Sequence, residues 1–306
     1  MNIYLPIAEM SVPIYLFVGM GMAVGFLSGM FGVGGGFLMT PLLILSGIPS
    51  PIAVGTEAAQ IVASSVSGAV AQWRRKNIDV KMGTVLLAGG LVGSVLGVQA
   101  VSLLRRTGQF DLVITLCYVV MLGAVGSLML IESLGTMRRS KAGKPLSARR
   151  SGQHNWVHGL PFKTRFPRSK LYISLVPPIL IGLFIGFLSG IMGVGGGFIL
   201  VPAMIYLLKM PTNVVVGTSL YQIMFVTAAT TIMQATWNYT VDIVLAVLLM
   251  IGGVIGAQLG AAAGAKLKGE ELRFLMAGMV LLVALRMAYT LFAHPGEIYS
   301  IGAEGH

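Results

Sequence analysis

The feature that most constrains this chain is a series of apolar stretches, each about as long as a lipid bilayer is thick. A helix needs about 20 apolar residues to cross ~30 Å of hydrocarbon. The stretches of that length lie at residues 12–31, 53–72, 82–103, 111–131, 172–192, 213–235, 242–265 and 272–292. The composition agrees, because only 10% of the residues are charged, which is too few to cover a soluble surface. We therefore expect an all-α polytopic membrane protein.

Two shorter apolar segments remain, at residues 34–45 and 195–208. Each directly follows a cluster of glycines and contains a proline. About a dozen residues are too few for an ordinary span, so we expect a broken or half-length helix at each position.

The chain also contains an internal duplication. Residues 25–41 read GFLSGMFGVGGGFLMTP and residues 186–202 read GFLSGIMGVGGGFILVP, with 12 of 17 positions identical. The match continues beyond the motif, where Gly55, Thr56, Gln60 and Asp79 correspond to Gly217, Thr218, Gln222 and Asp242. We therefore expect two repeats of about 160 residues, each with four full transmembrane helices and one short helix after the glycine motif.

The basic residues mark the connection between the repeats. Ten of the 21 Lys and Arg residues lie between Arg138 and Lys170. The expected division is a first transmembrane repeat at 1–132, a basic cytoplasmic linker at 133–171, a second transmembrane repeat at 172–293 and a short tail at 294–306. We expect the linker to rest against anionic lipid headgroups. Basic loops between apolar spans follow the positive-inside rule, so nucleic acid is not an expected partner despite a pI near 10.0.

The repeats are either parallel or inverted, depending on whether the short segments cross the bilayer. If they cross, each repeat has five crossings, the repeats are inverted, and the basic residues outside the spans divide 18 to 2 between the two sides. If the short segments are re-entrant, the division is 14 to 6. Basic residues collect on the cytoplasmic side, so the charges favour inverted repeats with both termini outside.

Three glycines in each repeat are candidate substrate-binding residues, namely Gly34, Gly35 and Gly36 with Gly195, Gly196 and Gly197. Glycine adopts positive φ readily, and a helix break at membrane depth leaves backbone N–H groups that need a partner. The helix that restarts after the break presents the positive end of its dipole, which suits an anion. The alternative is close helix packing, the interpretation we favour for the separate ladders that begin at Gly21 and Gly182 and repeat every fourth residue.

Four polar side chains in the spans that follow are further candidates for substrate binding, namely Thr56, Gln60, Thr218 and Gln222. In each repeat the threonine and the glutamine are four residues apart, which places them on one face of a helix. A glutamine amide donates and accepts hydrogen bonds, and lipid tails satisfy neither. The alternative role is hydrogen bonding between helices, which is common for glutamine in membranes.

Glu57 is the one carboxylate well inside a span, and its counterpart in the second repeat is the neutral Ser219. A carboxylate at membrane depth is costly to keep charged, so Glu57 is a candidate proton carrier for coupling. The alternative is a protonated or paired structural acid. Asp79 and Asp242 open the spans that follow them, and we interpret both as helix N-caps.

Catalytic and metal-binding groups are scarce in the spans. All four histidines lie in the linker or the tail, at positions 154, 158, 294 and 306. The spans therefore offer no Ser/His pair for catalysis and no His-containing set of metal ligands. The glycine clusters also lack the Lys and the Ser or Thr of a P-loop. We expect a protein that is not an enzyme and that uses no metal and no cofactor.

The doubled motif, G-x-x-S-G-x-x-G-V-G-G-G-F…P followed by Gly-Thr in the next span, resembles the TauE/SafE sulfite exporter family, also called the toluene sulfonate uptake permease family. The resemblance covers both repeats. It implies a multi-pass transporter in the bacterial inner membrane that moves sulfite, sulfonates or related sulfur-containing anions. The central linker is longer than the usual connection in that family.

The residues and the resemblance agree on a small anionic substrate. A sulfite or sulfonate group fits between two helix N-termini and the amide donors of Gln60 and Gln222. The expected function is therefore a secondary transporter that moves one repeat against the other. An anion channel of the same architecture is the alternative, and a membrane-embedded enzyme is less favoured.

Overall fold

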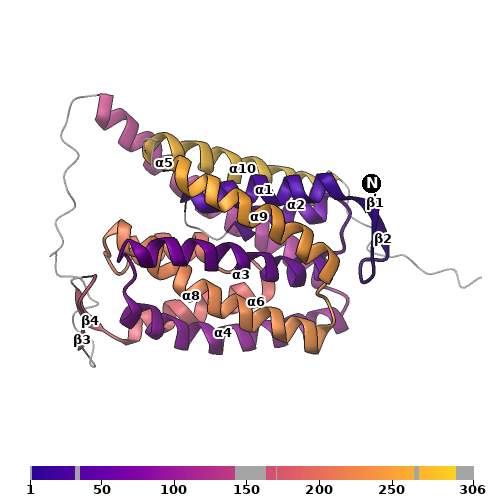
Figure 1. The fold of residues 1–306 in the computed structure, drawn as a ribbon, viewed down its shortest axis with the longest axis horizontal. Helices are drawn as coiled ribbons and strands as arrows, with labels where there is room; N and C mark the ends of the chain where they lie inside the picture. Colours follow the sequence, from indigo (N-terminus) through magenta and orange to yellow (C-terminus); the bar gives the residue numbers. More distant parts are fainter. Residues whose placement is uncertain (1, 32–34, 142–162, 170, 265–268, 294–306) are drawn as a thin grey trace, which may run out of the picture.

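The computed structural model describes residues 2–31, 35–141, 163–169, 171–264 and 269–293, and within them the chain is mostly helical (Figure 1). In chain order the helices are α1 (Ile14–Phe31), α2 (Gly36–Leu45), α3 (Ser50–Arg74), α4 (Val80–Arg106), α5 (Phe110–Lys141), α6 (Val176–Met192), α7 (Gly197–Tyr206), α8 (Thr212–Met233), the π-helix η2 (Gln234–Asn238), α9 (Ile243–Gly264) and α10 (Gly269–Ala293). The short helices α2 and α7 stand where the sequence predicts them.

Every stretch expected to span the membrane overlaps a helix. Of the described helices, four are long and apolar enough to cross a membrane by length and composition alone, and they cover Val80–Arg106, Phe110–Gly135, Val214–Asn238 and Ile243–Gly260. Large apolar side chains also point outward on α5 and α10, where Ile131, Leu282 and Leu285 are 68%, 68% and 73% exposed. An apolar surface of this kind fits lipid, so the chain is a helical membrane protein.

Two β-hairpins correct the expectation of an all-α chain. Their strands are β1 (Asn2–Leu5) with β2 (Met10–Pro13), and β3 (Lys163–Phe166) with β4 (Leu171–Ser174), each pair antiparallel. Each hairpin precedes the first helix of its half, so the stretches expected at 12–31 and 172–192 begin in strands. Proline explains these helix starts. It has no backbone N–H, which costs nothing in the first turn of a helix, where N–H groups have no helical partner, but would break a hydrogen bond further in. Pro13 ends β2, and a proline stands in the first turn of α6.

The expected linker at residues 133–171 contains regular structure at both ends. Helix α5 continues to Lys141, past the boundary expected at residue 132, and β3 begins at Lys163. Lys and Arg are good helix formers, so a helix does not have to end where its apolar span ends. The centre of the linker, 142–162, and the tail, 294–306, lie outside the described residues.

The helices of the two halves exchange partners. Helix α1 packs along α9, and correspondingly α6 packs along α4, while α3 lies against α8 and α5 against α10. A methyl group added at Gly21 or Gly25 would collide with the backbone of α9, and one added at Gly182 or Gly186 would collide with the backbone of α4. The interpretation of the glycine ladders as close packing surfaces is confirmed.

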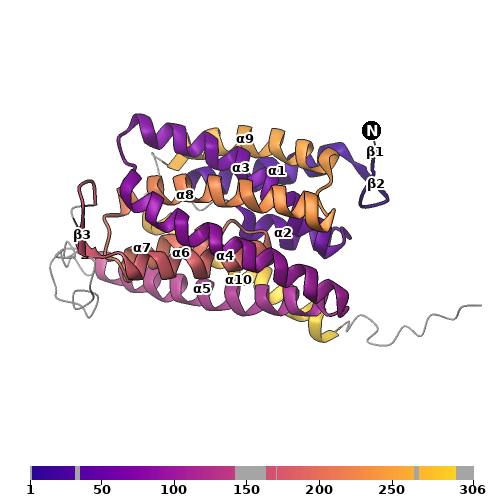
Figure 2. The ribbon, with the colours of Figure 1, turned by 90° about the horizontal axis from the view of Figure 1, so that it is seen from below.

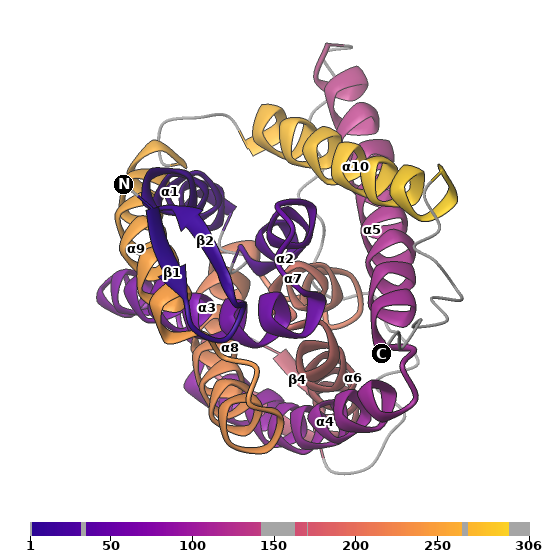
Figure 3. The ribbon, with the colours of Figure 1, turned by 90° about the vertical axis from the view of Figure 1, so that its right-hand side faces the viewer.

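Corresponding elements of the two halves lie at opposite ends of the bundle or meet inside it. The hairpin β1–β2 lies with the N-terminus at the right of Figure 1, and β3–β4 lies at the left. Figure 2 shows the same separation from below. Viewed along the helices, α2 and α7 lie next to each other in the interior (Figure 3).

Candidate substrate site

The glycine motif breaks the helix in both halves, as the sequence predicts. Helix α1 ends at Phe31 before α2 begins at Gly36, and α6 ends at Met192 before α7 begins at Gly197. The glycines with left-handed φ at the breaks are Gly35 (74°), Gly193 (71°), Gly195 (68°) and Gly196 (70°). Other residues are strained in this conformation, so the fold needs glycine there. Gly34 lies outside the described residues.

The two breaks come together inside the bundle. Phe37 and Phe198, each the second residue of a short helix, have ring centroids 5.5 Å apart. A methyl group added at Gly36 would collide with the Val194 carbonyl oxygen of the opposite break. The N-terminal ends of α2 and α7 therefore lie side by side, with the positive end of each helix dipole directed toward the same region.

Gln60 on α3 and Gln222 on α8 are fully buried, and their amide oxygens and nitrogens have no hydrogen-bond partner among the described residues. A methyl group added at Gly253 or Gly90 would collide with the amide nitrogen of Gln60 or Gln222, respectively. Leaving a buried polar group unpaired costs about 1–3 kcal/mol. Two unpaired amides at matched positions are therefore candidates for binding a ligand.

The residues that follow these glutamines contact the helix breaks. Ile61, which follows Gln60, would be struck by a methyl group added at either Gly36 or Gly195. Ile223, which follows Gln222, lies in the same way against Gly195. The structure thus brings the predicted residues Gly36 and Gly195 against the segments of α3 and α8 that carry Gln60 and Gln222, while the two amides themselves lie against α9 and α4.

The two threonines hold the starts of distant helices. The Asp242 N–H donates to the Thr56 hydroxyl at 3.0 Å, and the Asp79 N–H donates to the Thr218 hydroxyl at 3.0 Å. Both threonine side chains are fully buried. These contacts give the threonines a structural role between the halves, and their expected part in substrate binding stays a prediction.

Asp79 and Asp242 are N-caps, as the sequence predicts, and each also holds a hairpin. Asp79 Oδ1 accepts from the Met82 N–H at 3.1 Å, and its Oδ2 accepts from the Ser169 N–H and hydroxyl at 2.9 and 2.6 Å. Asp242 Oδ1 accepts from the Leu245 N–H at 3.1 Å, and its Oδ2 accepts from the Ile7 N–H at 2.9 Å. Each carboxylate therefore fixes the hairpin turn of the other half.

Glu57 is fully buried on α3, and neither carboxyl oxygen has a hydrogen-bond partner among the described residues. On α5 the buried Tyr118 hydroxyl donates to the Met192 carbonyl at 2.6 Å. The last carbonyl of α6 before the second break is thereby joined to α5. Sequence reasoning missed Tyr118, although a tyrosine inside the apolar stretch 111–131 is a detectable signal.

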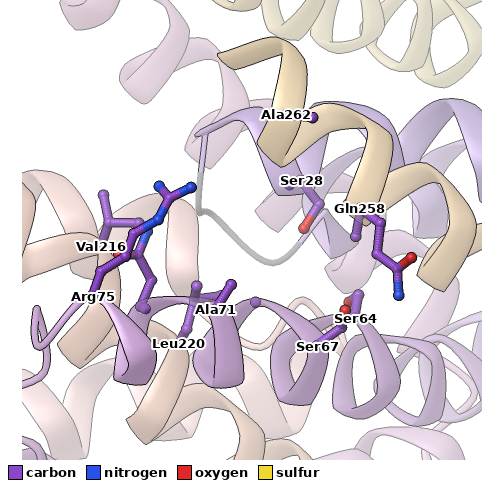
Figure 4. A pocket seen from close by; sticks show the side chains of 13 residues that line it. Ser28, Ser64, Ser67, Ala71, Arg75, Val216, Leu220, Gln258 and Ala262 are labelled. Atoms are coloured by element: carbon purple, nitrogen blue, oxygen red, sulfur yellow. The ribbon is translucent and has the colours of Figure 1, made fainter. Parts of the chain in front are cut away.

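A cavity of about 280 Å³ lies between α1, α3, α8 and α9 (Figure 4). Its polar lining residues are Ser28, Ser64, Ser67, Gln72, Arg75 and Gln258. In Figure 4 the Arg75 side chain is at one end, and Ser64, Ser67 and Gln258 are at the other. Ser64 lies one helical turn after Gln60 on α3, so the cavity leads from the exposed Arg75 toward the buried amide.

Apolar helices and two helix breaks that meet inside the bundle, with an adjoining cavity, are typical of a membrane protein of the transporter class. The chain belongs to the sulfite exporter TauE/SafE family, whose family model matches residues 17–287.

Several relatives are named as membrane transporters. The "Probable membrane transporter protein YjnA" of Bacillus subtilis is 30% identical over 278 residues, which cover 91% of this chain and 100% of that protein. The "Probable membrane transporter protein YunE" of the same organism is 27% identical over 282 residues, with 90% and 97% covered. A "Probable membrane transporter protein" of Xylella fastidiosa is 30% identical over 245 residues, with 79% and 82% covered. No solved structure matches the chain. Family and relatives together support membrane transport.

Proposed function

We propose that the protein is a secondary transporter that moves sulfite, a sulfonate or a related small sulfur-containing anion across the bacterial inner membrane. The proposal rests above all on the meeting of two short-helix N-termini beside the segments of α3 and α8 that carry two buried amides without partners among the described residues. In secondary transporters, broken helices commonly direct their N-terminal ends at an anionic group of the substrate.

The chemistry of this region suits such an anion. An ionised sulfonate group presents acceptor oxygens only, and the backbone N–H groups of a helix N-terminus and a glutamine amide are donors. These donors are uncharged, so they attract an anion without holding it against a fixed opposite charge. Transport requires binding that is favourable enough to admit the substrate and weak enough to release it.

The arrangement of the halves supports inverted repeats. Corresponding hairpins lie at opposite ends of the bundle (Figure 1), and corresponding helices exchange partners. At the β3–β4 end, Arg168 donates to the Lys76 carbonyl at 3.1 Å, beside the basic residues Arg74 and Arg75. By the positive-inside rule, these charges support a cytoplasmic position for this end and an outer position for both termini.

Binding of the anion is tested by a thermal-shift screen of the purified protein against sulfite, sulfate, thiosulfate, taurine and sulfoacetate. A ligand that binds the native state raises its apparent stability, by about 2.7 kcal/mol at a hundredfold excess over Kd. We expect sulfite or a sulfonate to raise Tm, with chloride at equal ionic strength as the control. A Tm that none of the five anions raises above the chloride value would contradict the proposed substrate class.

A further inference from the structure

The residues that line the cavity described above have counterparts in the second half, where a glutamine and a glycine are joined by a hydrogen bond. Gln72 and Gly29 both line the cavity, on α3 and α1 respectively. In the duplication Gln72 corresponds to Gln234 at the same offset as Gln60 to Gln222, and Gly29 corresponds to Gly190. The two halves therefore contain the same glutamine and glycine pair, once at each end of the bundle.

The second pair is bonded. The Gln234 amide nitrogen donates to the Gly190 carbonyl at 3.1 Å, which ties the end of α8 to α6. Its amide oxygen accepts from the Asn238 side chain at 2.7 Å and from the Thr240 hydroxyl at 3.3 Å. Gln234 is 1% exposed, so this contact fills the position that the cavity occupies in the first half.

The first pair is not bonded. The Gln72 amide oxygen accepts from the Asn77 side chain at 3.0 Å, much as Gln234 accepts from Asn238. Within the part of the chain that the structure describes, Gln72 makes no hydrogen bond to Gly29, and the cavity lies between their helices. The oxygens of Gln72 and Gln234 thus both accept from a nearby asparagine, while Gln72 makes no bond like the one from the Gln234 nitrogen to Gly190.

The charges at the two ends also differ. Arg75 lines the cavity and is exposed, whereas the corresponding position in the second half is Trp237. A cationic side chain at the mouth of a low-dielectric cavity raises the local concentration of anions. The volume of about 280 Å³ lies just below the usual range for ligand sites, which fits a small anion.

We propose that this cavity is the open half of the substrate path, with Arg75 attracting the anion, and that Gln72 and Gln234 are gate residues that close the two ends in turn. The inference rests on the proposed transport function and deepens it. In the opposite state, the Gln72 amide nitrogen bonds to the Gly29 carbonyl and Gln234 releases Gly190. By the charge rule the present state is open to the cytoplasm.

Cysteine accessibility tests the gates. The native Cys117 is replaced by Ser, and a single cysteine is placed at Ser67 in the cavity or at the matched position Ala229 in the closed half. Both are labelled with a membrane-impermeant maleimide in nanodiscs, where both faces are accessible. We expect rapid labelling of S67C and slow labelling of A229C.

Gate variants must then shift the two rates in opposite directions. Q234L removes the bond between Gln234 and Gly190, so A229C labelling rises about tenfold and S67C labelling falls. A tenfold change is the size expected when one hydrogen bond is lost from one state of a two-state equilibrium. Q72L prevents closure of the cavity, so S67C stays fast and A229C stays slow. Q99L, which replaces an exposed glutamine on α4, leaves both rates unchanged. Unchanged rates in Q234L, or a rise at both positions, would overturn the gate assignment.

Flux measurements separate this inference from the proposed function. Labelling needs no substrate, whereas sulfite flux into proteoliposomes reports transport. If the wild type transports sulfite but the Q234L variant does not change the two labelling rates in opposite directions, the gate assignment is refuted and the transport function stands. If the labelling rates change in opposite directions but no tested sulfur anion is transported, the proposed substrate class is refuted and the gate assignment stands.

Discussion

At the scale of single residues, Gln60 and Gln222 carry the proposed binding role, because their buried amides have no hydrogen-bond partner among the described residues. We predict that Gln60→Leu or Gln222→Leu lowers sulfite or sulfonate flux at least about tenfold, the loss expected for one hydrogen bond to a charged group. Stability should be unchanged or slightly higher, since an unpaired polar group is removed. Proteoliposome flux and Tm measure the two effects.

Gln99→Leu is the matched control for these variants, because Gln99 is exposed on α4 and should tolerate the same change in both measurements. Wild-type flux in both Q60L and Q222L would refute the binding assignment. A large loss of Tm in either variant would instead support a role of that amide in packing the helices together.

Glu57 has no partner for its carboxyl oxygens among the described residues, and Ser219 at the matched position bonds to its own helix at Val216. We predict that Glu57→Gln abolishes uphill accumulation of the anion but preserves counterflow exchange, because the amide resembles a protonated carboxyl that no longer releases its proton. Uphill accumulation and counterflow are measured in the same proteoliposomes. Glu9→Gln, at an exposed position, is the control, and undiminished uphill accumulation in E57Q would contradict proton coupling through this residue.

At the scale of elements, the helix breaks depend on glycines in the left-handed conformation. Gly195 has φ 68°, and a methyl group there would lie 3.0 Å from side-chain atoms of Ile61 and Thr227. We predict that Gly195→Ala lowers stability by about 1–3 kcal/mol, from backbone strain and this crowding, and weakens anion binding by displacing α7. Chemical unfolding and ligand-induced Tm shifts measure these effects.

Gly123→Ala on α5 is the control for the break, because the added methyl group meets nothing within 4 Å and alanine favours a helix. It should leave binding unchanged and stability equal or higher. A G195A variant as stable as G123A and with wild-type binding would show that the break does not form the site.

The helical elements were predictable because apolar length and an internal duplication are properties of the sequence itself. The hairpins were not, since their four-residue strands are too short for an alternating pattern and are fixed by distant carboxylates, with Asp79 bonded to Ser169 and Asp242 bonded to Ile7. The paired positions of Gln60 and Gln222 were visible in the sequence. Their lack of partners and the bond of Tyr118 to Met192 were not, because side-chain contacts between helices depend on how the helices rotate and pack.

At the scale of the whole molecule, the exchange of helix partners and the opposite hairpins predict inverted halves around a central site. Basic residues then gather at the β3–β4 end, which by the charge rule is the proposed cytoplasmic end. We predict that reporters fused to either terminus read the outer side, while a reporter in the linker at residues 142–162 reads the cytoplasm. A cytoplasmic reading at the C-terminus would exclude this topology.

Uphill anion transport tests the central claim most directly. Purified protein is reconstituted into proteoliposomes, an inward proton gradient is imposed, and uptake of labelled sulfite and taurine is followed with and without a protonophore. The account predicts accumulation above the external concentration that collapses when the protonophore is added and is abolished in the Q60L and Q222L variants. Flux that only equalises the two concentrations would indicate an anion channel, and the absence of flux for both anions would contradict the account.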